Sequence, residues 1–207
     1  MMKIETEEQL RALYGYPVGR AKQKQLPALE QHSRRFIHTS PFAVISTCNI
    51  HGQVDASPRG GQPGFIHVLD DNTLLIPDAK GNNRLDSLVN IVENGQIGCL
   101  FMIPGVNETL RVNGEAFVCT DDEYLDRFVQ GDSATEKHRP QSVIQVKVKE
   151  VFLHCAKAFM RSRLWSADAR IERSDFPTMG QMLNDQLGDA AKPESQQEME
   201  ARYLASL

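Results

Sequence analysis

Residues 42–58 read Phe-Ala-Val-Ile-Ser-Thr-Cys-Asn-Ile-His-Gly-Gln-Val-Asp-Ala-Ser-Pro, and this stretch decides the fold class. The run from Phe42 to Thr47 is rich in apolar and β-branched residues, which favour a strand. His51-Gly52 follows as a hairpin-like turn, because glycine tolerates the positive φ angles of tight turns. From Val54 to Pro58, polar residues alternate with apolar or small ones, as in a half-buried strand. The stretch therefore predicts an antiparallel hairpin.

The same pattern continues through the middle of the chain. A second hairpin is expected from residues 65–69 and 73–76, which flank the polar turn Asp70-Asp71-Asn72. Three further strands are expected at 96–103, 109–119 and 143–153, which makes about seven in all. Short strands at hairpin spacing favour an antiparallel barrel over a doubly wound sheet, in which a crossover helix follows each strand. We therefore expect a mainly β fold with helices, of the α+β class.

Helical patterns flank and interrupt this β-rich region. Before it, residues 5–39 have helical character, with a second segment that starts at Pro27, a residue suited to a first helical turn. Within it, helices are expected at 84–92 and 121–130, and after it at 155–163, 177–187 and 194–207. The expected organisation is an N-terminal helical appendage at 1–40, a β core at 41–155 and a C-terminal helical appendage at 156–207.

Composition limits the classes of function. With 207 residues, 41% of them hydrophobic, the chain can bury a core, and its net charge of −4 argues against a general nucleic-acid binder. No run of about 18 apolar residues predicts a membrane span, and the N-terminus lacks the pattern of a secretory signal. We therefore expect a cytoplasmic protein with no nucleic-acid or membrane partner.

Cysteine and histidine spacing gives little support for a metal site. The four cysteines form no Cys-x-x-Cys pair, and we expect them to be reduced and buried; the histidines show no ligand spacing. His67 and His154 lie in apolar strand-like runs, where a structural role is expected. We find no Ser-His-Asp set, carboxylate pair or activated cysteine, so no catalytic residue is assigned.

The segment from Lys80 to Val92 has the chemistry of an anion site. It reads Lys-Gly-Asn-Asn-Arg-Leu-Asp-Ser-Leu-Val-Asn-Ile-Val, which places two cations ahead of a helix whose free N–H groups attract anions. Asn82 or Asn83 is the expected cap of this helix. Its expected buried face consists of Leu85, Leu88, Val89 and Val92. The alternative is an ordinary strand-to-helix turn whose Lys80 and Arg84 face water.

Five blocks of sequence occur in an order that resembles the pyridoxamine 5′-phosphate oxidase-like flavin proteins, specifically a branch of FMN-dependent members without assigned substrates. The resemblance covers roughly residues 25–185. The blocks are Ile45-Ser46-Thr47 with His51-Gly52-Gln53, Asp55 to Gly60, Asp78 to Leu85, Glu108 to Gly114, and Lys157-Ala158 with Arg161 to Trp165.

The resemblance implies a split β-barrel that binds FMN at a homodimer interface, with the C-terminal appendage packed on the core or on the dimer partner. It places Thr109 and Arg111 beside the isoalloxazine ring. FMN rather than FAD also agrees with the absence of a Gly-x-Gly-x-x-Gly fingerprint. The FMN-binding residues it implies are Ser57, Arg59, Pro77, Asp78, Lys80, Asn83, Arg84, Thr109 and Arg111.

The chain departs from true pyridoxamine 5′-phosphate oxidases at three motifs. Their basic strand carries an arginine and a lysine separated by four apolar residues, where this chain has Ser57-Pro58-Arg59-Gly60-Gly61. Their Ser-Arg-Lys at the helix is replaced by Asn83-Arg84-Leu85, so that Lys80 is the expected substitute for the missing lysine. Their Arg-x-His near the C-terminus is also not found. Pyridoxamine 5′-phosphate is therefore not the expected substrate.

A basic cluster near the end of the expected core has two interpretations. On a helix, Lys157 and Arg161 share one face, with Arg163 and Trp165 close by. The cluster is either a positive lip for the flavin or an anionic substrate, or a solvated helix whose only Trp is a packing anchor.

Two functions remain open at this stage. The first is an FMN-dependent oxidoreductase of an unknown small-molecule substrate, in which the flavin performs the hydride or electron transfer and a nicotinamide or deazaflavin donates. The second is a non-catalytic protein that binds or stores flavin or haem on the same scaffold.

Overall fold

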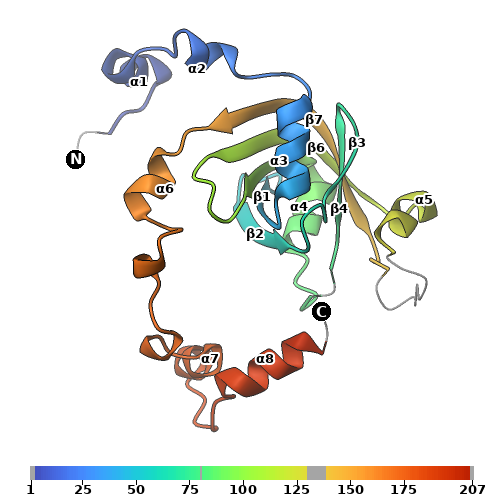
Figure 1. Cartoon of the computed structure of the whole chain (residues 1–207), viewed down its shortest axis with the longest axis vertical. Coiled ribbons are helices and arrows are strands. Elements are labelled where there is room, and N and C mark those ends of the chain that lie inside the picture. The colour runs from blue at the N-terminus through green and yellow to red at the C-terminus, as the bar shows by residue number, and fades with distance from the viewer. Residues whose placement is uncertain (1–2, 80, 130–138, 206–207) are drawn as a thin grey trace. The chain divides into compact units, whose positions relative to one another are not determined.

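The computed structural model describes residues 3–79, 81–129 and 139–205 (Figure 1). The chain divides into two compact units, Met1–Trp165 and Ser166–Leu207. The first unit contains the sheet and every residue of the expected cofactor site that the structure describes. The second contains two 3-10 turns, Ala167–Ala169 and Arg173–Asp175, and the helices α7 (Met179–Leu187) and α8 (Gln196–Leu204).

Seven antiparallel strands form one sheet in the order β2-β1-β5-β6-β7-β4-β3. All seven lie where the sequence pattern predicts them, so the α+β split-barrel prediction is confirmed. The ladder does not close, because β2 and β3 are its two edges. The strands are β1 (Phe42–Cys48), β2 (Val54–Gly60), β3 (His67–Asp70), β4 (Thr73–Pro77), β5 (Gln96–Met102), β6 (Thr109–Cys119) and β7 (Val143–His154).

One face of the sheet, here called the inner face, carries the core. Ala43 and Ile45 of β1, Phe101 of β5 and Val112 of β6 are each buried on it. The long strands β6 and β7 bend at a bulge between Asn113 and Gly114. A Cβ atom on Gly114 would lie 2.1 Å from the carbonyl oxygen of Lys147, so only glycine lets the two strands approach at this bend.

Helix α3 (Gln31–Thr39) begins four residues later than the position of Pro27 predicts. Its N-cap is Glu30, whose carboxylate accepts from the backbone N–H of Ser33 while the Ser33 hydroxyl accepts from the Glu30 N–H. This reciprocal capping box satisfies two backbone donors and fixes the start of the helix. The chain before α3 contains α1 (Glu7–Tyr14) and α2 (Arg20–Gln23) and joins the sheet through a bridge from Leu26 to Val151.

The remaining helices of the first unit lie around the sheet in Figure 1. They are α4 (Asp86–Asn94), α5 (Asp122–Leu125) with the 3-10 turn η1 (Asp126–Phe128), and α6 (Lys157–Ser162). The predicted helix at 121–130 is thus a short α-turn followed by a 3-10 turn up to Phe128, and Gln130 lies outside the described residues. Among the helices that the structure describes, none is long and apolar enough to span a bilayer.

Candidate functional site

Strand β2 presents its polar residues to the inner face. In the register of the hairpin, Ser57 pairs with Ile45 and Arg59 pairs with Ala43. Paired residues of antiparallel strands project to the same side, so Ser57 and Arg59 lie on the side of the core. The alternation that the sequence showed in β2 therefore places two candidate phosphate-binding residues at an inner-face edge.

Arg59 carries an unsatisfied donor in this position. Its Nη1 donates to the Ser57 hydroxyl at 3.0 Å and to the Pro58 carbonyl at 3.3 Å. Its Nε is buried and has no acceptor, the one such side-chain nitrogen or oxygen among the described residues. A buried guanidinium N–H without a partner is costly, and an anionic oxygen would remove that cost.

Pro77 and Asp78 follow at the end of β4, near Arg59. Pro77 pairs with Val143 of β7, and the Asp78 N–H donates to the Ser142 carbonyl at 3.0 Å. Burial raises the pKa of the Asp78 carboxyl above its ordinary value, and the charge of Arg59 opposes that rise. The side chains of Arg59 and Asp78 therefore share one partly desolvated region.

The loop before α4 differs from the sequence expectation. The helix begins at Asp86, and its N-cap is Leu85, with no side-chain capping bond from Asn82 or Asn83. Asn83 and Leu85 both have left-handed backbones, with φ of 61° and 60°. Two non-glycine residues in this region within three positions make the turn strained, which is a feature of functional loops.

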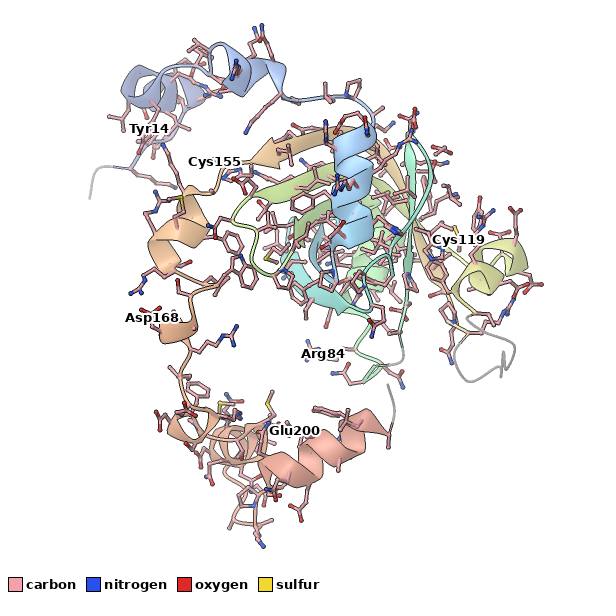
Figure 2. The ribbon with its side chains drawn as sticks, viewed as in Figure 1. Tyr14, Arg84, Cys119, Cys155, Asp168 and Glu200 are labelled. Atoms are coloured by element: carbon pink, nitrogen blue, oxygen red, sulfur yellow. The ribbon has the colours of Figure 1, made fainter. Side chains whose placement is uncertain are left out.

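Arg84 lies at this turn and is exposed (Figure 2). Its side chain is 73% exposed and pairs with Asp86, with Nε 2.8 Å from Oδ2. The charge and hydrogen bonds of Asp86 raise the pKa of Arg84. Arg84 is therefore available at the surface rather than fixed beside Arg59. Lys80, the expected substitute cation, lies outside the described residues.

Helix α4 packs on the sheet through polar side chains and through the buried Ile91, and the predicted buried face is wrong for three of its four residues. Leu85, Val89 and Val92 are 50%, 47% and 77% exposed, and Leu88 is the one of the four that packs against the core. Ile91, which was not part of the prediction, is 3% exposed and belongs to the core. The helix instead turns three hydrogen-bonding side chains inward. Ser87 donates to Asp55 at 2.6 Å, Asn90 donates to Thr47 at 3.0 Å, and Asn94 donates to the Cys48 carbonyl at 3.1 Å.

Thr109 and Arg111 lie on the opposite, outer face of the sheet. Arg111 pairs with Leu100, and Asn113 pairs with Gly98, which in turn pairs with Ser46. These residues alternate with the buried inner-face residues of the same strands. Together with α6 they line a cavity of about 360 Å³. Its lining is Ser46, Gly98, Cys99, Leu100, Thr109, Arg111, Asn113, His154, Cys155, Ala158 and Phe159.

Polar groups in this cavity are held by their neighbours. The guanidinium of Arg111 lies over the ring of Phe152, 5.1 Å from its centroid, and Asn113 donates to Glu150 at 2.9 Å. Gly98 leaves space at the base of the cavity, because it has no side chain there; a Cβ at this position would lie 3.2 Å from the Asn113 Oδ1. The cavity can therefore accept a flat ligand against β5 and β6.

The candidate residues thus form two sets within one copy of the chain. The inner set is Ser57, Arg59 and Asp78; the outer set is Thr109, Arg111 and Asn113. Because the sets project from opposite faces of the same sheet, they do not form one pocket in a single copy. The sequence identified most members of both sets but gave no indication of this separation.

The tail cluster is a short helix with a packed tryptophan. Trp165 donates its Nε1–H to the Val106 carbonyl at 2.9 Å and stacks on Phe159, with ring centroids 5.4 Å apart. Lys157 and Arg161 are exposed on α6, and Arg163 ends the helix with φ of 52°. Trp165 therefore packs against Phe159, which lines the outer cavity, while Lys157 and Arg161 are exposed at the surface.

Several lining residues were missed or misjudged from the sequence. His154, for which a structural role was expected, is exposed at the end of β7 and lines the cavity. Cys155 is exposed where β7 leads into α6 (Figure 2), so the expectation of burial is wrong for this cysteine. Burial raises the pKa of the Cys99 thiol to about 12, which makes it a protonated core group at neutral pH. Ser46 and Asn113 carried a usable signal, since each alternates with buried neighbours along its strand.

Comparison with known proteins adds a family relationship. A family model described as pyridoxamine 5′-phosphate oxidase matches residues 29–155. HupZ of Group A Streptococcus is 22% identical over 60% of this chain and 93% of its own, with a TM-score of 0.47. A NimC/NimA family protein of Clostridium acetobutylicum is 14% identical over 61% and 87%, with a TM-score of 0.46. No curated protein matches the sequence.

Proposed function

The chain belongs to the pyridoxamine 5′-phosphate oxidase family, and we propose that it is an FMN-dependent oxidoreductase of a small-molecule substrate. The observation that carries the proposal is the buried Nε of the half-buried Arg59, which has no hydrogen-bond partner. A flavin phosphate would supply acceptors for that donor and for the Ser57 hydroxyl, and charge-assisted bonds of this kind are among the strongest in proteins.

The residues of the loop before α4 complete the phosphate end in this proposal. Arg84 is exposed and pairs with Asp86, so it can exchange that partner for a phosphate oxygen. Asn83 and Leu85 hold the loop in its left-handed turn next to the helix start. Bound FMN would supply the hydride or electron transfer itself. The task of the protein side chains is to bind, orient and exclude water.

A second copy of the chain is part of the proposal. The outer set of one copy would meet the inner set of the other. The first copy would then supply Thr109 and Arg111 to a flavin whose phosphate is bound by Ser57 and Arg59 of the second. The exposed apolar residues Leu85, Val89 and Val92 of α4 support such an interface, because a contiguous apolar stripe is costly in water. The proposal does not extend to pyridoxamine 5′-phosphate as substrate, since the Arg-x-His motif is not found.

The test is flavin binding by the purified chain. We expect a flavin absorption spectrum, or saturable FMN uptake by the apoprotein, and a loss of about tenfold or more in affinity for Arg59→Gln, because one charge-assisted pair is removed. Arg35→Gln is the matched control, since Arg35 is an exposed arginine on α3 outside both sets. Equal losses in the two variants would place the phosphate elsewhere.

Reduction of the bound flavin separates an enzyme from a binding protein. Anaerobic mixing with NADH or NADPH should bleach the flavin band if a nicotinamide is the donor. Bound flavin that no donor reduces, including a reduced deazaflavin, would favour storage. A chain that takes up no FMN but binds haem, with a Soret band, would replace the proposed function by the haem alternative.

A further inference from the structure

A second cavity lies between α3, β3 and η1 and shares no residue with the two sets described above. Its volume is about 400 Å³. Four basic side chains line it from three separate elements: Arg34 and His38 of α3, His67 of β3 and Arg127 of η1. The remaining lining residues are Gly64, Ile66, Val68 and Leu69. We call this region the basic groove.

The charged groups that act on His67 in the basic groove are cationic. Burial lowers the pKa of the His67 imidazole, and the charges of Arg127 and His38 lower it further. None of the described residues that line the groove is acidic. The nearby carboxylates pair from outside it, Asp71 with Arg34 and Glu123 with Arg127, in half-exposed ion pairs of the kind that contribute little to stability. Both arginines are therefore easily redirected to a ligand.

One wall of the groove is apolar and fixed. Ile66 is buried, and His67 stacks on Phe128 with ring centroids 4.2 Å apart. Gly64 has φ of 87°, and a Cβ there would lie 3.2 Å from the Nδ1 of His38, so the glycine lets the His38 ring approach the loop. The groove thus combines two guanidinium groups with an apolar and aromatic wall.

We propose that the basic groove binds a small organic anion, a carboxylate or phosphate monoester with an apolar body. Arg34 and Arg127 bind the anionic head from two sides, and the body lies along Ile66, Val68 and Leu69. Guanidinium forks suit either head group, and a concave site with an apolar lining and a few convergent polar groups is typical of small-molecule sites. The proposal is independent of the flavin.

The test titrates the full-length protein with benzoate, phenyl phosphate and inorganic phosphate while the imidazole resonances are followed by NMR. His67→Gln assigns the His67 resonance. We expect saturable shifts at His67 with benzoate and phenyl phosphate, and a rise of its pKa in their presence, because a bound anion favours the imidazolium. The charged groups that face His67 are Arg34 and His38 from α3 and Arg127 from η1.

Matched variants decide the outcome. Arg34→Gln and Arg127→Gln should each weaken phenyl phosphate by about tenfold or more, whereas Arg35→Gln on the same helix should not. FMN affinity should be unchanged in all three, so that failure here is distinct from failure of the flavin site. Equal loss in Arg35→Gln, or unsaturable shifts, would overturn the proposal. Inorganic phosphate binding as tightly as phenyl phosphate would overturn the ligand class.

Discussion

Ser87→Ala tests the polar contact that attaches α4 to the first hairpin. The Ser87 hydroxyl donates to Asp55 at 2.6 Å, and Ser87 is 4% exposed. The substitution leaves a half-buried carboxylate without this donor. It should lower the free energy of unfolding, because the lost bond is to an acidic side chain and water does not readily take the place of a buried hydroxyl.

The magnitude follows from two opposing contributions. A hydrogen bond to a charged group contributes about 1.5–3 kcal/mol, and the partial exposure of Asp55 places this one near the lower end. Alanine is favoured over serine by about 0.5 kcal/mol in a helix interior, and at most this amount offsets the loss, because Ser87 lies in the first turn of α4. The net loss should be about 1–2 kcal/mol, which lowers the urea midpoint by roughly 0.5 M.

Urea unfolding at pH 7 measures the loss. The single tryptophan, Trp165, belongs to the same compact unit as the sheet and provides the fluorescence signal. Ser162→Ala is the control, because Ser162 is an exposed helical serine whose hydroxyl donates to the Phe159 carbonyl in its own helix. A double-mutant cycle with Asp55→Asn isolates the pair. A coupling energy below about 0.5 kcal/mol would refute the reasoning.

Three further predictions concern the bulge, the basic groove and α4. Gly114→Ala should abolish folding or cost about 3 kcal/mol or more, because its Cβ would meet the Lys147 carbonyl oxygen. Gly81→Ala should be near neutral, because a Cβ there would come no nearer than 4.0 Å to the Ala79 carbonyl oxygen, an ordinary contact; thermal unfolding compares the two variants. Because the pKa of His67 is lowered in the folded state, the unfolded chain takes up a proton at higher pH than the folded chain does, so the free energy of unfolding should fall as the pH drops below about 6.5. The fall should be smaller in His67→Gln. Urea midpoints at pH 7.5 and 5.5 measure it for both proteins, and equal declines in the two would contradict the prediction. Val92→Glu should convert the proposed dimer to a monomer in light scattering and weaken FMN binding, while Glu93→Lys on the same helix should do neither. A Val92→Glu variant that remains a dimer would exclude this face as the interface.

Local patterns in the sequence were sufficient for the strands. Alternation in β2 and β6, and the turn at His51-Gly52, depend only on neighbouring residues, so all seven strands could be located to within a few positions. The order of the strands could not be obtained in this way. Strand β5 lies between β1 and β6, and β4 pairs with β7, because these contacts join segments far apart in the chain.

Helix α4 shows where periodicity misleads. Leu85, Leu88, Val89 and Val92 recur at helical spacing, which is the pattern of a buried face, yet three of them are exposed. The helix instead docks through the buried Ile91 and through Ser87, Asn90 and Asn94, because β1 and β2 present Asp55, Thr47 and the Cys48 carbonyl there. A polar surface on one element selects the polar face of the other, and no pattern within the helix reveals its partner.

The sequence alone determined the strand-rich α+β architecture, the family resemblance and the residue types of an anion and flavin site, because each depends on local spacing and chemistry. Only the tertiary structure decided how those residues are distributed. Strand register sends Ser57 and Arg59 to the inner face and Thr109 and Arg111 to the outer face. It also brings Arg34, His67 and Arg127 from three elements into one groove. Such juxtapositions follow from pairing and packing between distant segments, and these are properties of the folded chain.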